Sequence, residues 1–85
     1  MNIYELTPVY DSRKSFYSKA TVLKDYENDI IQLKSYDTIV AQIKNGVASI
    51  NGTYSPTTLR HIKDFLYQNG FEVGTKKELE EMYIK

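Results

Sequence analysis

The chain has 85 residues, no cysteine, and eleven Lys and Arg against eleven Asp and Glu, so its formal net charge is zero. This length provides for one hydrophobic core, and we expect a single domain over residues 1–85, stabilised by packing without disulfides. Zero net charge excludes bulk attraction to nucleic acid as the main binding force and also excludes acidic mimicry of DNA. The apolar runs are short and interrupted by charge, so we expect no membrane span, no signal peptide and a cytoplasmic location.

The N-terminal half of the chain predicts a loop followed by a sheet. Residues 1–15 are expected to form an N-terminal segment or loop, and residues 16–54 an antiparallel sheet of three to four strands. The first expected strand is 16–24 (FYSKATVLK), with Phe16, Ala20 and Val22 on one face. Residues 25–28 then read as a polar turn.

Two further segments, 29–36 and 38–44, are rich in the β-branched and aromatic residues that suit strands. Asn45-Gly46 follows the second of them, and this dipeptide is the strongest short-range hairpin signal because both residues tolerate positive φ. A two-residue turn predicts the pairs Lys44 with Val47, Ile43 with Ala48, and Ala41 with Ile50.

The segment Ser35-Tyr36-Asp37 leaves two arrangements open. A three-residue turn would set Leu33 opposite Ile39, whereas one long bent strand would keep the same alternation without a turn. Both arrangements place Ile39 on the core face and Val40 on the opposite face.

The C-terminal third predicts two helices. Residues 55–70 form the main helix, with Ser55 as N-cap, Pro56 at the first position and Gly70 as stop signal. Its apolar stripe is Leu59, Ile62, Phe65 and Leu66. Residues 71–85 are expected to form a short strand or turn and then a C-terminal helix.

A capping box formed by Thr75 and Glu78 begins this second helix, whose inward residues are expected to be Leu79, Met82 and Tyr83. Strands first and helices last, each with one apolar face, predict a two-layer α+β domain.

The residue inventory excludes most catalytic classes. His61 is the only histidine, so with no cysteine the usual zinc sites are absent, and no metal or other cofactor is expected. No glycine-rich phosphate loop is present.

His61 itself has two interpretations. It is either a boundary histidine that hydrogen-bonds Asp64 or Thr57, or part of an anion site with Arg60 near the helix N-terminus. The expected structural partner of Arg60 is Asp64, four residues on.

Three fragments carry a family resemblance: DSRKSFYSKA at 11–20, LKSYDTIVA at 33–41 and YSPTTLRHIKDFL at 54–66. Together they resemble a small uncharacterised family of phages and mobile elements, with the pattern D-S-R-K-S-F-Y-x-K-A, L-x-S-Y-x-T-x-V-A and Y-S-x-T-T-x-R-H-I. The resemblance implies a phage or mobile-element setting and assigns no activity. The residues that fall on the polar positions of the pattern are Ser12, Arg13, Lys14, Ser35, Tyr36, Thr38, Thr57, Thr58, Arg60 and His61.

These positions suggest a binding site, completed by exposed tyrosine and lysine. The candidate residues are Ser12, Arg13, Lys14, Tyr17, Lys19, Ser35, Tyr36, Thr57, Thr58, Arg60 and His61. They converge if the N-terminal loop folds over the end of the sheet near the start of the main helix. The competing interpretation is that Asp11 and Arg13 form internal pairs that only tie this loop down.

The first functional hypothesis is a non-catalytic protein-binding module that modulates a host defence or replication factor, with a host or phage protein as partner. The alternative is nucleic-acid or nucleotide binding through the basic and tyrosine-rich surface. A third hypothesis is a metal-independent ribonuclease that uses His61 with Arg60 and Lys14. The sequence leaves the oligomeric state open, a homodimer included.

Overall fold

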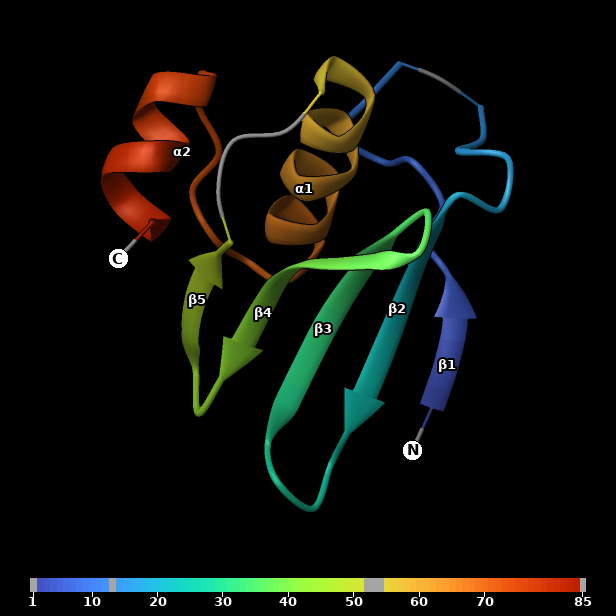
Figure 1. The fold of residues 1–85 in the computed structure, drawn as a ribbon, viewed down its shortest axis with the longest axis vertical. Coiled ribbons are helices and arrows are strands. Elements are labelled where there is room, and N and C mark those ends of the chain that lie inside the picture. Colours follow the sequence, from blue (N-terminus) through green and yellow to red (C-terminus); the bar gives the residue numbers. More distant parts are fainter. Residues whose placement is uncertain (1, 13, 52–54, 85) are drawn as a thin grey trace.

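The structure, a computed structural model, describes residues 2–12, 14–51 and 55–84. Within these residues, five antiparallel strands form one sheet in the order β1-β2-β3-β4-β5, and two helices lie against one face of it (Figure 1). The strands are β1 (Asn2–Glu5), β2 (Ala20–Asp25), β3 (Ile30–Ser35), β4 (Thr38–Lys44) and β5 (Val47–Ile50), and the helices are α1 (Pro56–Gln68) and α2 (Lys76–Tyr83). The α+β class is confirmed, and the described residues form five strands where three to four were expected.

The additional strand is β1, which lies in the segment expected to be a loop. It pairs with β2 from Asn2 opposite Lys24 to Glu5 opposite Thr21. All four residues of β1 are exposed, so the strand has no alternation of buried and exposed residues for a sequence pattern to reveal. Arg13 and residues 52–54, the expected end of the sheet, lie outside the described residues.

Strand β2 begins at Ala20 and not at Phe16, because a tight turn precedes it. The backbone N–H of Lys19 donates to the carbonyl of Phe16 at 3.1 Å, and the two central residues, Tyr17 and Ser18, have φ of 55° and 62°. Phe16 is nevertheless buried with Ala20. The core face of this segment is therefore as predicted, although its first part is not a strand.

The hairpin between β4 and β5 is confirmed. Asn45 and Gly46 have φ of 52° and 80°, as a turn with two left-handed residues requires. The observed pairs are Lys44 with Val47, Ile43 with Ala48, and Ala41 with Ile50.

Both predicted arrangements of the β3–β4 connection are wrong. Ser35 pairs with Thr38 across a two-residue turn, and the register shifts between Leu33 and Lys34, so Leu33 lies opposite Ala41. The shift is a β-bulge, which inserts one extra residue into one strand. Val40 is consequently buried in the core with 1% exposure, and not on the opposite face.

The predicted ends of both helices are largely confirmed. The Ser55 side chain accepts the N–H of Thr58 at 3.4 Å, and Gly70 follows α1 with a φ of 82°. In α2, Thr75 and Glu78 form both halves of the capping box. Residues 71–75 form an irregular connection and not a strand.

The inward face of α2 is narrower than predicted. Leu79 and Tyr83 are buried, whereas Met82 is 40% exposed. Leu79 and Tyr83 lie four residues apart, so they form one stripe along this eight-residue helix. Met82 lies beside the stripe and points away from the core.

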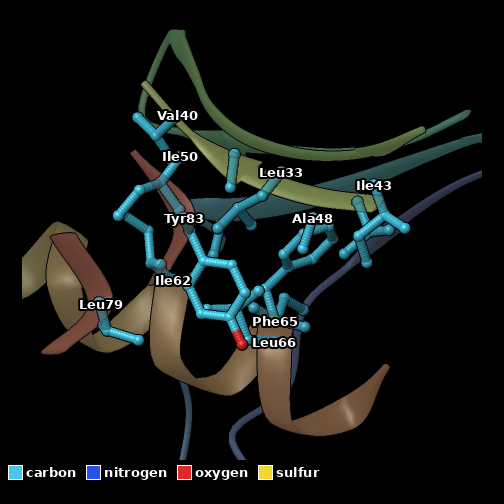
Figure 2. Close-up of a cluster of buried hydrophobic side chains, with 14 of the residues drawn as sticks. Leu33, Val40, Ile43, Ala48, Ile50, Ile62, Phe65, Leu66, Leu79 and Tyr83 are labelled. Atoms are coloured by element: carbon cyan, nitrogen blue, oxygen red, sulfur yellow. The ribbon is translucent and has the colours of Figure 1, made fainter. Parts of the chain in front are cut away.

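The core lies between the sheet and the two helices, as the labelled side chains in Figure 2 show. Ile62, Phe65 and Leu66 of α1 have no exposed surface, and Leu33 of β3 is likewise fully buried. This packing holds α1 along β3. The first turns of α1 therefore lie beside the β3–β4 turn, and the candidate site forms there.

Candidate functional site

A pocket of about 260 Å³ forms where three separate segments meet: the turn before β2, the β3–β4 turn and the first two turns of α1. Its lining residues are Ser15, Phe16, Tyr17, Lys19, Tyr36, Thr57, Arg60 and His61. Six of these eight were predicted as site residues, namely Tyr17, Lys19, Tyr36, Thr57, Arg60 and His61. Ser15 and Phe16 complete the wall and were missed. Phe16 has the sequence signal of a core residue, and it is one, with an edge that also faces the pocket.

The other predicted residues do not line the pocket. Ser35 and Thr58 are buried, with their hydroxyl oxygens 3.0 Å apart. Ser12 and Lys14 are exposed on the N-terminal segment. Arg13 lies outside the described residues. The expected convergence therefore occurs in part, and on the loop side Lys19 is the cation that lines the pocket.

His61 is 1% exposed. The expected hydrogen bond to Asp64 or Thr57 is not formed, and Ser35 is the partner instead. Nδ1 of His61 lies 2.8 Å from Oγ of Ser35, which also contacts Thr58. His61 shares the buried face of α1 with Ile62 and Phe65, and that face is turned toward β3. The expected boundary position was therefore wrong.

Aromatic rings surround the imidazole. The Phe16 ring lies edge-on to His61 with 4.6 Å between ring centroids, and the Tyr36 ring lies 6.1 Å away. Nζ of Lys19 lies 5.7 Å from the centroid of the Tyr36 ring, within the range of a cation–π contact. One wall of the pocket is therefore aromatic and carries a cation at its edge.

Two of the lining tyrosines stand on strained backbone. Tyr17 and Tyr36 both have φ of 55°, a region that bulky residues seldom adopt. Their exposed fractions are 72% and 50%. Burial of the side chain does not explain the strain at either position. Such strain tends to gather at binding sites and active sites, where the surrounding structure holds it in place.

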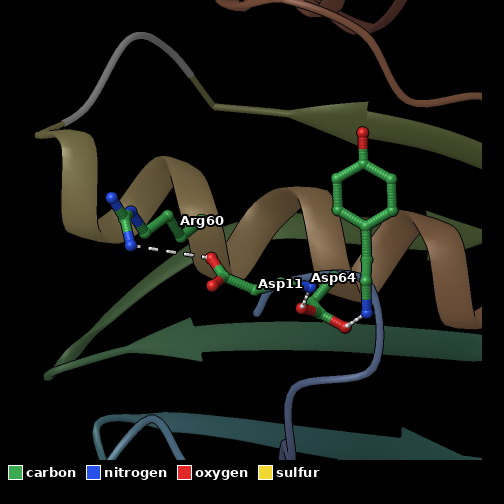
Figure 3. Close-up of polar contacts among 4 residues, drawn as sticks. Asp11, Arg60 and Asp64 are labelled. Atoms are coloured by element: carbon green, nitrogen blue, oxygen red, sulfur yellow. Dashed lines mark hydrogen bonds and ion pairs between the residues drawn. The ribbon is translucent and has the colours of Figure 1, made fainter. Parts of the chain in front are cut away.

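The N-terminal segment is held along α1 by a buried carboxylate, shown in Figure 3. Asp64 has no exposed surface and accepts the backbone N–H groups of Val9, Tyr10 and Asp11 at 2.8, 2.9 and 3.0 Å. It also accepts from Nε2 of Gln68 at 2.9 Å. Asp64 was predicted to pair with Arg60. Its observed partners are instead the N-terminal segment and Gln68.

Burial alone would raise the pKa of Asp64. The hydrogen bonds from the three backbone N–H groups and from Gln68 outweigh that effect and lower its pKa. The carboxylate is therefore charged at neutral pH, and its charge is matched by these donors. The sequence signal that was missed is an acid located between the apolar residues of a helix face.

Arg60 contacts Asp11 and not Asp64 (Figure 3). Nη1 of Arg60 lies 3.9 Å from the Asp11 carboxylate, and the Arg60 side chain is 45% exposed. In the 11–20 fragment, Asp11 makes internal contacts with Asp64 and Arg60, whereas the binding site stays a prediction. The Asp11 end is a structural tie, whereas residues 15–19 contribute four of the pocket-lining residues.

The pKa of His61 is lowered, first because burial disfavours the charged ring. The carboxylates of Asp11 and Asp64 act in the opposite direction, and the charge of Lys19 lowers the pKa further. His61 is therefore neutral at pH 7.

This shift predicts a loss of stability on acidification. The pKa of His61 is depressed in the folded state, so below its ordinary value of 6.5 the unfolded chain takes up a proton first. The stabilisation is present above pH 6.5 and decreases as the pH falls, by at most about 1.4 kcal/mol per pH unit. Urea unfolding at pH 7, 6 and 5 measures it.

The control for this prediction is His61→Asn, which removes the titrating group. In this variant the stability should change less between pH 7 and 5, because the depressed pKa of Asp64 acts below its ordinary 3.8. Equal slopes for the two proteins would contradict the assignment to His61.

Among residues 2–12, 14–51 and 55–84, no group of three or more His, Cys, Asp and Glu is arranged to hold a metal ion. None of the described helices is both long and apolar enough to cross a membrane.

Comparison with known proteins gives one match. A family model described as a family of unknown function (DUF8033) matches residues 4–81. No curated protein and no solved structure matches the chain. Since the match covers α1, most of α2 and almost the whole sheet, the chain belongs to this family of unknown function, DUF8033.

Proposed function

We propose that the protein is a non-catalytic binding module that docks a partner protein on the face around the pocket. The observation that carries this proposal is the pair Tyr17 and Tyr36, which are both exposed, both on strained backbone and both in the pocket lining that also contains Arg60. Tyrosine and arginine dominate the energetic centres of protein interfaces. The tight turns at 16–19 and 35–38 hold the backbone in this conformation, and strained positions of this kind cluster at binding sites.

The chemistry around His61 supports binding over catalysis. General acid–base catalysis needs a titrating group within reach of the substrate and a second group to exchange the proton. Nδ1 of His61 is engaged by Ser35, so Nε2 is the imidazole nitrogen that remains for a proton transfer. The nearby carboxylate of Asp64 accepts four N–H groups. Lys14, which the ribonuclease hypothesis combines with His61 and Arg60, is not among the lining residues, and this supports binding over catalysis.

The partner is proposed to be a host protein, and the setting a phage or mobile element acting in the cytoplasm. The resemblance of the 11–20, 33–41 and 54–66 fragments supports the setting. The absence of cysteine supports a reducing compartment.

The proposal is tested by affinity capture with matched baits. Wild-type protein, a Tyr17→Ala/Tyr36→Ala double variant and a Tyr26→Ala control are compared by quantitative mass spectrometry. Tyr26 is 70% exposed at the β2–β3 turn and is not among the lining residues, so it controls for loss of an exposed tyrosine. A partner enriched on wild type and control and lost on the double variant supports the proposal. Equal capture by all three baits contradicts it.

Arg60→Ala provides a second prediction on this site. The Arg60 side chain is 45% exposed, and its ion pair with Asp11 is long at 3.9 Å, so the substitution should cost less than about 1 kcal/mol of stability. Partner binding should be lost. Thermal unfolding and capture are measured in parallel, with Lys77→Ala of α2 as the charge-removal control. A fall in stability of several kcal/mol would mean that Arg60 is mainly a tie to Asp11.

Single-stranded nucleic acid is the second candidate partner, favoured by the approach of Lys19 to the Tyr36 ring. Each phosphate contact should then steepen the dependence of log K on log salt by about 0.7. The net charge of the chain is zero, and the described pocket lining contains one lysine and one arginine. We therefore expect a slope that corresponds to about two phosphate contacts. Absence of binding at low salt rules this candidate out.

A further inference from the structure

The charge of the pocket lining is one-sided. Lys19 approaches from the turn before β2 and Arg60 from α1, and none of the eight lining residues is acidic. Ser15 and Thr57 add hydroxyl groups to the same lining. Among the described residues this lining holds two cations and hydroxyl donors and no carboxylate, which suits an anion.

Three carboxylates of the described residues lie near the pocket without lining it, and that of Asp11 contacts Arg60. Asp64 is held by backbone N–H groups of the N-terminal segment. Glu5 accepts the backbone N–H of Ser18 at 3.0 Å. The contact of Arg60 with Asp11 at 3.9 Å is longer than a hydrogen bond, so the guanidinium retains donors for a ligand.

His61 supplies a further polar atom. Its Nδ1 is engaged by Ser35, and no described residue hydrogen-bonds Nε2. No buried side-chain nitrogen or oxygen of the described residues lacks a partner. Nε2 is therefore accessible to solvent, and since His61 lines the pocket, solvent reaches it there. If Ser35 donates to Nδ1, the neutral ring carries its proton on Nε2 and can donate it to a ligand.

The size of the pocket limits what enters it. A volume of about 260 Å³ lies just below the roughly 300–1,000 Å³ of typical small-molecule sites. One side chain or one small anionic group fits this space, and a folded loop or a stretch of polymer does not.

We infer that the pocket binds one oxyanion, a carboxylate or phosphate group on the anchoring residue of the partner protein, between Lys19 and Arg60 and within reach of Nε2 of His61. This inference rests on the proposed function and names the chemistry that the partner must present. The aromatic wall of Phe16 and Tyr36 would pack against the carbon atoms that carry the anion.

His61 allows a direct test because it is the only histidine, so its imidazole NMR signals need no assignment. Phenyl phosphate and propionate are titrated separately into the protein at constant ionic strength, with phenol as the neutral probe. The expected result is a saturable shift of the imidazole signals with one or both anions and none with phenol. The anion that binds more tightly identifies the source as a phosphorylated or an acidic residue.

Anion binding should also raise the pKa of His61. The charges that act on the ring are those of Asp11 and Asp64, which raise its pKa, and that of Lys19, which lowers it. Arg60 adds a second cation to the pocket. An oxyanion beside Nε2 adds negative charge and favours the imidazolium. A pH titration of the same signals with and without the probe measures this change.

The matched variants are Lys19→Met and Arg60→Met, with Lys77→Met as control. Removal of either pocket cation should weaken binding of the probe by about tenfold, as expected for loss of a hydrogen bond to a charged group. An unchanged affinity in both pocket variants, or no saturable shift with either anion, overturns the inference.

Failure of the inference and failure of the proposed function give different results. A partner that is lost on the tyrosine double variant and on Arg60→Ala, in a protein that shows no saturable shift with either anion, leaves the function intact and refutes the anion. Saturable anion binding without a pocket-dependent protein partner refutes the function. Adenosine monophosphate serves as a fourth probe, and tighter binding of this nucleotide than of phenyl phosphate would overturn the assignment to a protein anchor.

Discussion

Asp64→Ala is expected to lower the free energy of unfolding by about 3 kcal/mol or more. The substitution removes the acceptor of three backbone N–H groups, those of Val9, Tyr10 and Asp11, and of the Gln68 amide. Each donor left buried without a partner costs roughly 1–3 kcal/mol, and movement of the segment into water reduces the total. Urea unfolding measures the loss.

Hydrogen exchange locates the effect of Asp64→Ala. The amides of residues 9–11 should lose protection first, since they are the donors to the carboxylate. Glu81→Ala is the control, because Glu81 is an exposed acid of the other helix. A loss of stability no larger than in this control would show that water or another acceptor replaces the carboxylate at little cost.

The elements that could be predicted from the sequence are those decided by local chemistry. The turn at Asn45-Gly46 requires two left-handed residues, and the capping box at Thr75 and Glu78 satisfies the free N–H groups at a helix start. Each depends on residues within four positions of one another. The predicted register of the β4–β5 hairpin and the predicted start of α2 are therefore confirmed.

The features that were missed depend on residues distant in the chain. Strand β1 is exposed along its whole length and is defined only by pairing with β2. The bulge that buries Val40 is visible only in the register of β3 against β4. Asp64 accepts from residues more than fifty positions earlier, so its position among apolar residues of a helix face indicates burial but does not identify its partners.

The candidate site was predicted in part for the same reason. Polar residues near the ends of elements were identified as one set, and the fold divides them. Thr57 and Arg60 line the pocket, whereas Ser35 and Thr58 lie beneath it as a buried hydroxyl pair. The periodicity of α1 did not distinguish residues that line the pocket from residues buried beneath it. That distinction depends on which face of α1 meets the β3–β4 turn.

His61→Ala is expected to cost about 2–4 kcal/mol of stability, more than Arg60→Ala. The His61 side chain is 1% exposed, packs edge-on against Phe16 and bonds Ser35 at 2.8 Å. Removal of the imidazole leaves a cavity that joins the pocket. It also removes one hydrogen-bond partner of the buried Ser35 hydroxyl. Ser35→Ala should cost about 1–3 kcal/mol, because it leaves Nδ1 of His61 and the Thr58 hydroxyl without this partner.

The contact between His61 and Ser35 couples the two substitutions, and a double-mutant cycle measures the coupling. We expect His61→Ala/Ser35→Ala to be less destabilising than the sum of the single variants by at least about 0.5 kcal/mol, as for residues in one hydrogen-bond network. A parallel cycle of His61→Ala with Tyr26→Ala should give additive losses, since Tyr26 is exposed at the β2–β3 turn. Additivity in both cycles would mean that the imidazole is held by packing against Phe16 alone, and Ser35 would then have no part in directing Nε2 toward the pocket.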